Sequence, residues 1–236
     1  MGFPNTVIDC VGPASDDVGW LNAGARITVR GNATNGVGNA MAQGRIYIAG
    51  DIGARGMTMT KHNPRFAPPA LWVLGGVGDS FAEFMAGGNA VVCGYGVAPE
   101  RPVLGYRPCV GMVGGKVFFR GECRGYSAAD AVLGTVDDED WRWLTDGLKA
   151  FLAAIDRPAL FKPLITDRAQ WQVLSARRPQ EKHAGPSRPL PLFLREVWEA
   201  QLGTGGLIGD LTDLDRSPVD VIPTGDLRRF VPVWEN

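Results

Sequence analysis

Five short segments of this chain share one pattern, an alternating apolar stretch that ends on glycine. They are RITVRG ending at Gly31, RIYIAG at Gly50, ALWVLG at Gly75, NAVVCG at Gly94 and KVFFRG at Gly121. The intervals between these glycines are 19, 25, 19 and 27 residues. The longer intervals contain KHNPRFAPPA and YGVAPERPVL, whose prolines are typical of loops. Without them, the sequence repeats about every 19 residues.

Each of the five segments predicts a strand with one face in a core. Apolar residues stand four and two places before each glycine, and the alternation of a strand turns both to the same face. These inward pairs are Ile27 and Val29, Ile46 and Ile48, Leu71 and Val73, Ala90 and Val92, and Val117 and Phe119. We therefore expect the pairs to stack into one continuous core.

A second column of residues stands between the members of each pair and faces the other way. It consists of Thr28, Tyr47, Trp72, Val91 and Phe118. A stripe with this much apolar surface is seldom left exposed to water. We expect either the second half of the chain or another subunit to cover it, which makes Tyr47, Trp72 and Phe118 candidates for a partner interface.

The repeat predicts the fold of residues 1–125. A unit of about 19 residues cannot bury its own apolar face and must stack on its neighbours. Parallel crossovers are nearly always right-handed, so the prediction is a right-handed, single-stranded parallel β-helix. The five glycines that end the strands are then turn residues, where the backbone takes positive φ or passes close to the next turn.

A glycine-rich loop for a nucleotide phosphate is the alternative for residues 31–50. The stretch from Gly36 to Met41 lacks the third glycine of a dinucleotide loop and meets Gly44 before a helix could form. GGVGD at 75–79 lacks the lysine-serine/threonine ending of a phosphate loop. The turn interpretation is favoured, and no cofactor site is predicted on this chain.

Residues 126–236 form a second region of different composition. Of the 32 glycines, 24 lie in residues 1–125. TVDDEDWRWLTDGLKAFLAAI predicts a helix over about 135–155, with Thr135 as N-cap and acidic residues in the first turn. The rest is a proline-rich, irregular C-terminal extension, which we expect to pack on the β-helix or on a partner.

The charge balance and the Cys and His content give no sign of a nucleic-acid, membrane, metal or catalytic site on this chain. Lys and Arg number 24 against 25 Asp and Glu, so no general field attracts nucleic acid or an anionic membrane. No apolar run approaches the roughly 18 residues of a membrane span, and we expect a cytoplasmic protein. The four cysteines include no Cys-x-x-Cys pair, and His62 and His183 lie in proline-rich stretches. We predict no catalytic residue and no metal site.

Three stretches resemble a known family. GNATNGVGNAMAQGRIYIAGDIG, LWVLGGVGDSFAEFMAGGNAVVCG and CVGMVGGKVFFRG are similar to the GXGXG repeat domain at the C-terminal end of the glutamate synthase large chain. The likeness is greatest to the archaeal type, in which this domain is a separate subunit. It covers roughly residues 10–165 and rests on the Gly-Val-Gly-Asn/Asp and Met-x-Gly-Gly units.

The resemblance implies a right-handed β-helix without catalytic residues that positions a glutaminase and an FMN/iron-sulfur synthase subunit in a hetero-oligomer. Such a complex converts glutamine, 2-oxoglutarate and reductant into two glutamates, with FMN and the iron-sulfur clusters on the partner subunits. The same repeat occurs in a subunit of formylmethanofuran dehydrogenase, so assembly of that tungsten or molybdenum enzyme is an alternative. A free-standing β-helix that binds a ligand is another.

Overall fold

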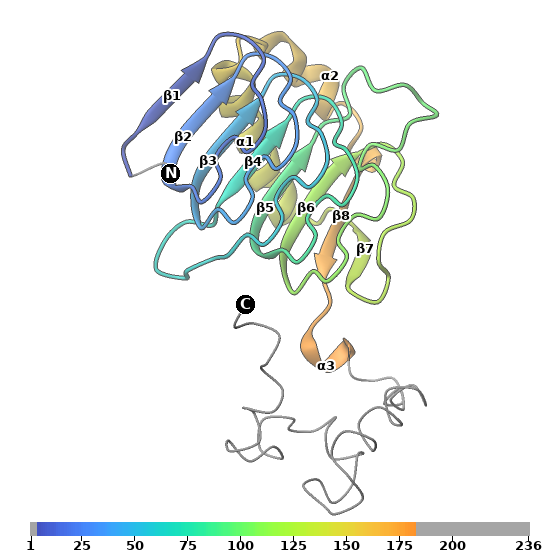
Figure 1. The fold of residues 1–236 in the computed structure, drawn as a ribbon. Helices are drawn as coiled ribbons and strands as arrows, with labels where there is room; N and C mark the ends of the chain where they lie inside the picture. Colours follow the sequence, from blue (N-terminus) through green and yellow to red (C-terminus); the bar gives the residue numbers. More distant parts are fainter. Residues whose placement is uncertain (1–3, 183–236) are drawn as a thin grey trace, which may run out of the picture. The chain divides into compact units, whose positions relative to one another are not determined.

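The computed structural model describes residues 4–182, and their strands form a single eight-stranded sheet (Figure 1). The strands are β1 (Val7–Cys10), β2 (Ala23–Val29), β3 (Gln43–Ile48), β4 (Ala70–Val73), β5 (Ala86–Val92), β6 (Gly114–Arg120), β7 (Ala131–Thr135) and β8 (Trp171–Ala176). Their order in the sheet is β1-β2-β3-β4-β5-β6-β8-β7. Pairing is parallel from β1 to β6, and β8 is antiparallel to both β6 and β7.

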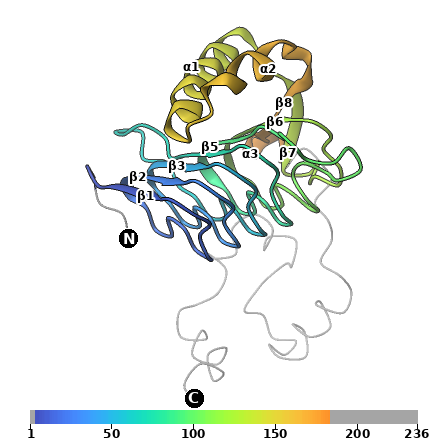
Figure 2. The same cartoon turned by 90° about the horizontal axis from the view of Figure 1, so that it is seen from above.

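The helices follow the parallel strands in the chain. They are α1 (Asp138–Ala154), α2 (Phe161–Ile165) and α3 (Pro179–Lys182), with short 3-10 turns at Pro158–Leu160 and Arg168–Gln170. Figure 2 shows α1 and α2 over one face of the sheet, while the segments that connect the parallel strands lie over the other. Within residues 4–182, no helix is long and apolar enough to cross a membrane.

The predicted parallel register is confirmed. Tyr47 pairs with Thr28 on one side and Trp72 on the other, and Val91 joins Trp72 to Phe118. All five predicted inward pairs are members of one buried core. Periodicity of two and the glycine spacing were therefore sufficient to align the strands correctly.

The predicted right-handed, single-stranded parallel β-helix is wrong. The described chain forms one open, mixed sheet, and the segments that return from one strand to the next are turns. Arg55, Met57 and Met59, in one such segment, have φ values of 61°, 56° and 55°. An extended strand cannot contain left-handed residues at alternate positions, so these segments form no further sheet.

The turns nevertheless stack on one another through their backbones. The Asp17 N–H donates to the Asn35 carbonyl at 2.8 Å, and the Gly36 N–H donates to the Ala54 carbonyl at 2.9 Å. The predicted roles of the strand-ending glycines are both seen: Gly94 has φ 61°, whereas a Cβ on Gly31 would lie 2.9 Å from the Pro13 nitrogen. Backbone hydrogen bonds between turns thus replace the ladders of additional sheets.

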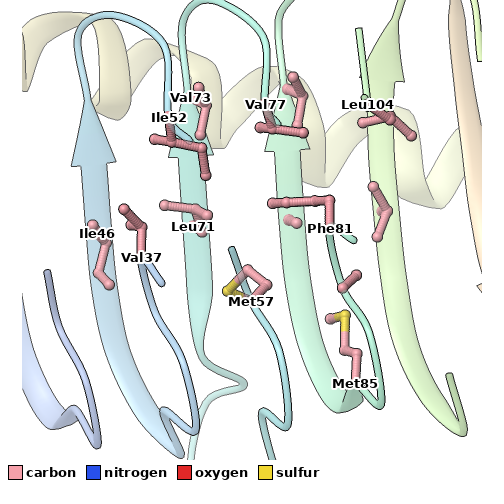
Figure 3. Close-up of a cluster of buried hydrophobic side chains, with 14 of the residues drawn as sticks. Val37, Ile46, Ile52, Met57, Leu71, Val73, Val77, Phe81, Met85 and Leu104 are labelled. Atoms are coloured by element: carbon pink, nitrogen blue, oxygen red, sulfur yellow. The ribbon is translucent and has the colours of Figure 1, made fainter. Parts of the chain in front are cut away.

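The main core lies between the sheet and the stacked turns. Figure 3 shows side chains from both meeting there, such as Ile46 and Leu71 from strands and Val37 and Phe81 from turns. These four side chains are almost fully buried. Each contributes roughly 1.5–3 kcal/mol on burial, so the turns are fixed to the sheet by apolar contact as well as by backbone hydrogen bonds.

The N-cap of helix α1 lies two residues after the predicted one. Asp137, not Thr135, is the N-cap, and its carboxylate accepts the Asp140 N–H at 2.8 Å. Thr135 is the last residue of β7, so it is still in a strand. Lys116 of β6 approaches the Asp140 carboxylate at 2.7 Å and ties the start of the helix to the sheet.

The region after residue 125 contributes to the same sheet, because β7 and β8 lie at its end. The division of the chain into residues 1–125 and 126–236 stays a prediction. The predicted C-terminal extension from residue 183 onward lies outside the described residues.

Candidate protein-interaction surface

The three predicted interface residues lie in one stripe across the sheet, under the chain's own helix α1. Tyr47, Trp72 and Phe118 are buried. The ring centroids of Tyr47 and Phe151 of α1 are 5.6 Å apart, and those of Phe118 and Trp143 of α1 are 5.2 Å apart. Helix α1 is therefore the covering, the first of the two possibilities that the sequence leaves open. A partner could reach this stripe only if α1 moved away.

Strand β1 is an edge of the sheet, with no strand on its outer side within residues 4–182. The carbonyls of Thr6 and Cys10 accept the N–H groups of Arg26 and Arg30, each at 2.9 Å. In a parallel ladder, alternate residues bond to the same neighbour, so the backbone groups of the intervening positions point outward. An edge of this kind can pair with another chain.

Large apolar side chains are exposed on β1 and on the turn that follows it. We call this set the first-turn surface; its residues are Val7, Ile8, Val11, Trp20 and Leu21. Val11 is 82% exposed and Val7 59%. Beside them, Cys10, Ala14 and Val18 are only partly buried against the main core. Within residues 4–182, no polar segment covers this end of the stack of turns, although repeat proteins commonly end in a polar cap.

Three carboxylates lie on or beside the first-turn surface. Asp9 is paired with Arg30, whereas Asp16 and Asp17 are exposed and form no ion pair within residues 4–182. Arg26 of β2 lies next to Val7. Hydrogen bonds from Arg30 lower the pKa of Asp9, and hydrogen bonds from the Thr34 hydroxyl and the Asn35 N–H lower the pKa of Asp16. Both carboxylates therefore stay ionised at neutral pH.

A cavity of the described chain lies where the parallel strands end. It has a volume of about 620 Å³, and Asn32, Asp51, Tyr95, Asp156 and Arg157 supply its polar lining. Asp51 is paired with Arg101 and Asp156 with Arg30, which holds both carboxylates in ion pairs. Among the described residues, its lining includes no His, Cys, Ser or Lys.

The chain has two histidines, of which the structure describes one. His62 is exposed, with Nε2 3.1 Å from the Phe66 carbonyl oxygen, and His183 lies outside the described residues. Within residues 4–182, no group of three or more His, Cys, Asp or Glu side chains is placed to hold a metal ion.

The four cysteines are free and differ in burial. Burial raises the pKa of the Cys93 and Cys109 thiols and raises that of Cys123 from 9.0 to about 11. At pH 8, Cys123 should therefore react with iodoacetamide roughly tenfold more slowly than a thiol of unshifted pKa, because its smaller thiolate fraction is partly offset by the greater nucleophilicity of a thiolate of higher pKa. We expect Cys93 and Cys109 to be labelled only after unfolding and Cys10 to be labelled first, as measured by peptide mass spectrometry. Rapid labelling of Cys93 in the folded protein would contradict this core.

No protein-family model matches this chain, and a comparison with curated proteins finds no match either. The first-turn surface is therefore assigned from geometry alone. The five-segment repeat missed it, although the sequence holds a signal: VIDCVG ends at Gly12, which is 19 residues before Gly31. β1 is this sixth segment, and its Ile8 pairs with Ile27 of the inward column.

Proposed function

We propose that this chain is a structural subunit of a multisubunit enzyme and that the first-turn surface is where another subunit docks. The observation behind this proposal is that exposed apolar side chains and an open sheet edge coincide at one end of the stack. Exposed apolar patches on soluble proteins commonly mark interaction sites. A β-edge adds backbone hydrogen bonds that give such a contact direction.

For the enzyme, we propose a complex of the glutamate synthase type. The support is the resemblance of the glycine and methionine motifs, not the fold, because the implied β-helix is not what the chain forms. Met41, Met85 and Met112, which mark the motifs, are all fully buried just before a strand, in keeping with a true structural repeat. In this proposal a glutaminase-type and an FMN/iron-sulfur subunit perform the chemistry, and the complex is cytoplasmic.

Purification of the full-length tagged chain from the cells that encode it tests this function. We expect it to elute with an FMN and iron-sulfur protein, and the fraction to form glutamate from 2-oxoglutarate only when glutamine and reductant are present. A tungsten or molybdenum pterin in the fraction would instead favour the formylmethanofuran dehydrogenase type. A colourless, unaccompanied chain would overturn the assembly role.

A further inference from the structure

We propose that the first-turn surface binds its partner by β-strand addition: an extended, Lys- or Arg-bearing segment of a different protein pairs with β1. This proposal rests on the docking role given above, but not on the identity of the enzyme. It concerns the chemistry of the segment that docks.

The backbone of β1 provides the first part of the argument. Thr6 and Cys10 use their carbonyls toward β2, so alternation directs the N–H and C=O groups of Val7 and Asp9 to the open side. An added strand would satisfy these groups. It would also continue the parallel ladder that already joins β1 to β6.

The side chains determine which face of the added strand is apolar. Ile8 pairs with Ile27, whose column lines the main core, while Asp9 pairs with Thr28 on the opposite face. A strand placed beside β1 would therefore extend the core with an apolar residue next to Ile8. Its alternate residues would lie on the same face as Asp9.

Charge selects the partner. Asp16 and Asp17 are exposed and form no ion pair within residues 4–182, whereas Asp9 is already paired with Arg30. A second copy of this chain would therefore add two more unpaired carboxylates to these two. Like charges placed opposite one another disfavour association, whereas Lys or Arg on the incoming segment would complement them. The geometry therefore points to a basic partner strand rather than to self-association.

Titration of the full-length chain with model strands tests this inference. The probe is an acetylated and amidated peptide of alternating valine and lysine, and the control peptide has glutamate in place of lysine. We expect the lysine peptide to slow amide hydrogen exchange at Val7 and Asp9, and the glutamate peptide to bind at least about tenfold more weakly. N-methylation of alternate peptide residues should abolish binding, because those residues can no longer donate hydrogen bonds to the edge.

Two matched variants test the position of the contact. Ile8 on β1 is 43% exposed and Val132 on the opposite edge strand β7 is 40% exposed. We expect Ile8→Thr to weaken peptide binding about tenfold and Val132→Thr to leave it unchanged. Equal binding of both peptides, equal effects of both variants, or unchanged exchange at β1 would overturn the proposal.

Self-association has its own signature. If sedimentation shows a dimer in the absence of peptide, with Val7 and Asp9 already protected from exchange, the occupant is a second copy and the proposal is wrong. Because the peptide titration requires no flavin partner, its result is independent of whether the native complex proves to be a glutamate synthase.

Discussion

Gly78→Ala is expected to lower the free energy of unfolding by about 3 kcal/mol or more, enough to unfold a marginally stable domain. A Cβ on Gly78 would lie 2.6 Å from the Gly53 carbonyl carbon and 2.7 Å from the Ala54 nitrogen. Both atoms are backbone of the preceding turn, so relief requires the two turns to separate. Urea unfolding followed by far-UV circular dichroism would measure the loss.

Substitutions at two other glycines distinguish the cost of a steric clash from the cost of a left-handed backbone. Gly12 has open space around its Cβ position and no left-handed φ, so Gly12→Ala should change stability by less than about 0.5 kcal/mol. Gly96 is equally open but has φ 75°, and Gly96→Ala should cost about 1 kcal/mol. If Gly78→Ala costs no more than Gly96→Ala, the turns are not stacked as closely as described.

The facing of the strand residues could be predicted from the sequence, because the alternation of a strand depends only on neighbouring residues. Ile46 and Ile48 face the core and Tyr47 faces α1, as the two-residue period predicts. The spacing between glycines then aligned Tyr47 with Trp72 across an inserted loop. Both facts follow from the chain passing through the same sheet once in every repeat.

The return segments were not predictable from the same signals. Their left-handed positions are often occupied by ordinary residues such as Arg55 and Ser80, for which sequence gives no warning of positive φ. The two Gly-Val-Gly motifs suggest a wrong alignment of the turns. The Gly36 N–H donates to the Ala54 carbonyl, and the Arg55 N–H donates to the Asp79 carbonyl. Gly36 is thus stacked near Arg55, and the motif at 36–39 does not align with that at 76–79.

Non-local contacts explain the remaining differences. β8 inserts antiparallel between β6 and β7 although it lies after the long helix, and no periodicity within β8 specifies that placement. The candidate site depends on the same kind of information. Tyr47 and Phe118 are buried because α1 covers them, whereas Ile8 on the other face is exposed because β1 is the edge of the sheet. Neither the docking of α1 nor the position of β1 at the edge can be read from the local alternation of these strands.

Gly147→Ala should lower the free energy of unfolding by about 2 kcal/mol. In an exposed part of a helix, the same substitution would stabilise the helix by about 1 kcal/mol. Gly147 lies in the middle of α1, and a Cβ there would overlap Cη2 and Cζ2 of the Trp72 indole. That indole is held on its other sides, with ring centroids 5.3 Å from Trp143 and 5.9 Å from Phe151, and it cannot rotate away freely.

A double-mutant cycle with Trp72→Ala identifies the cause. Trp72→Ala alone should cost about 3–5 kcal/mol, because it leaves a cavity between α1 and the sheet. In that background the added methyl group of Gly147→Ala enters free space, and the intrinsic preference of alanine for helix should make the second change neutral or stabilising. The sign of the Gly147→Ala effect therefore reports whether α1 rests on Trp72. A destabilisation of equal size in both backgrounds would show that the helix packs elsewhere and that the apolar stripe is open to a partner after all.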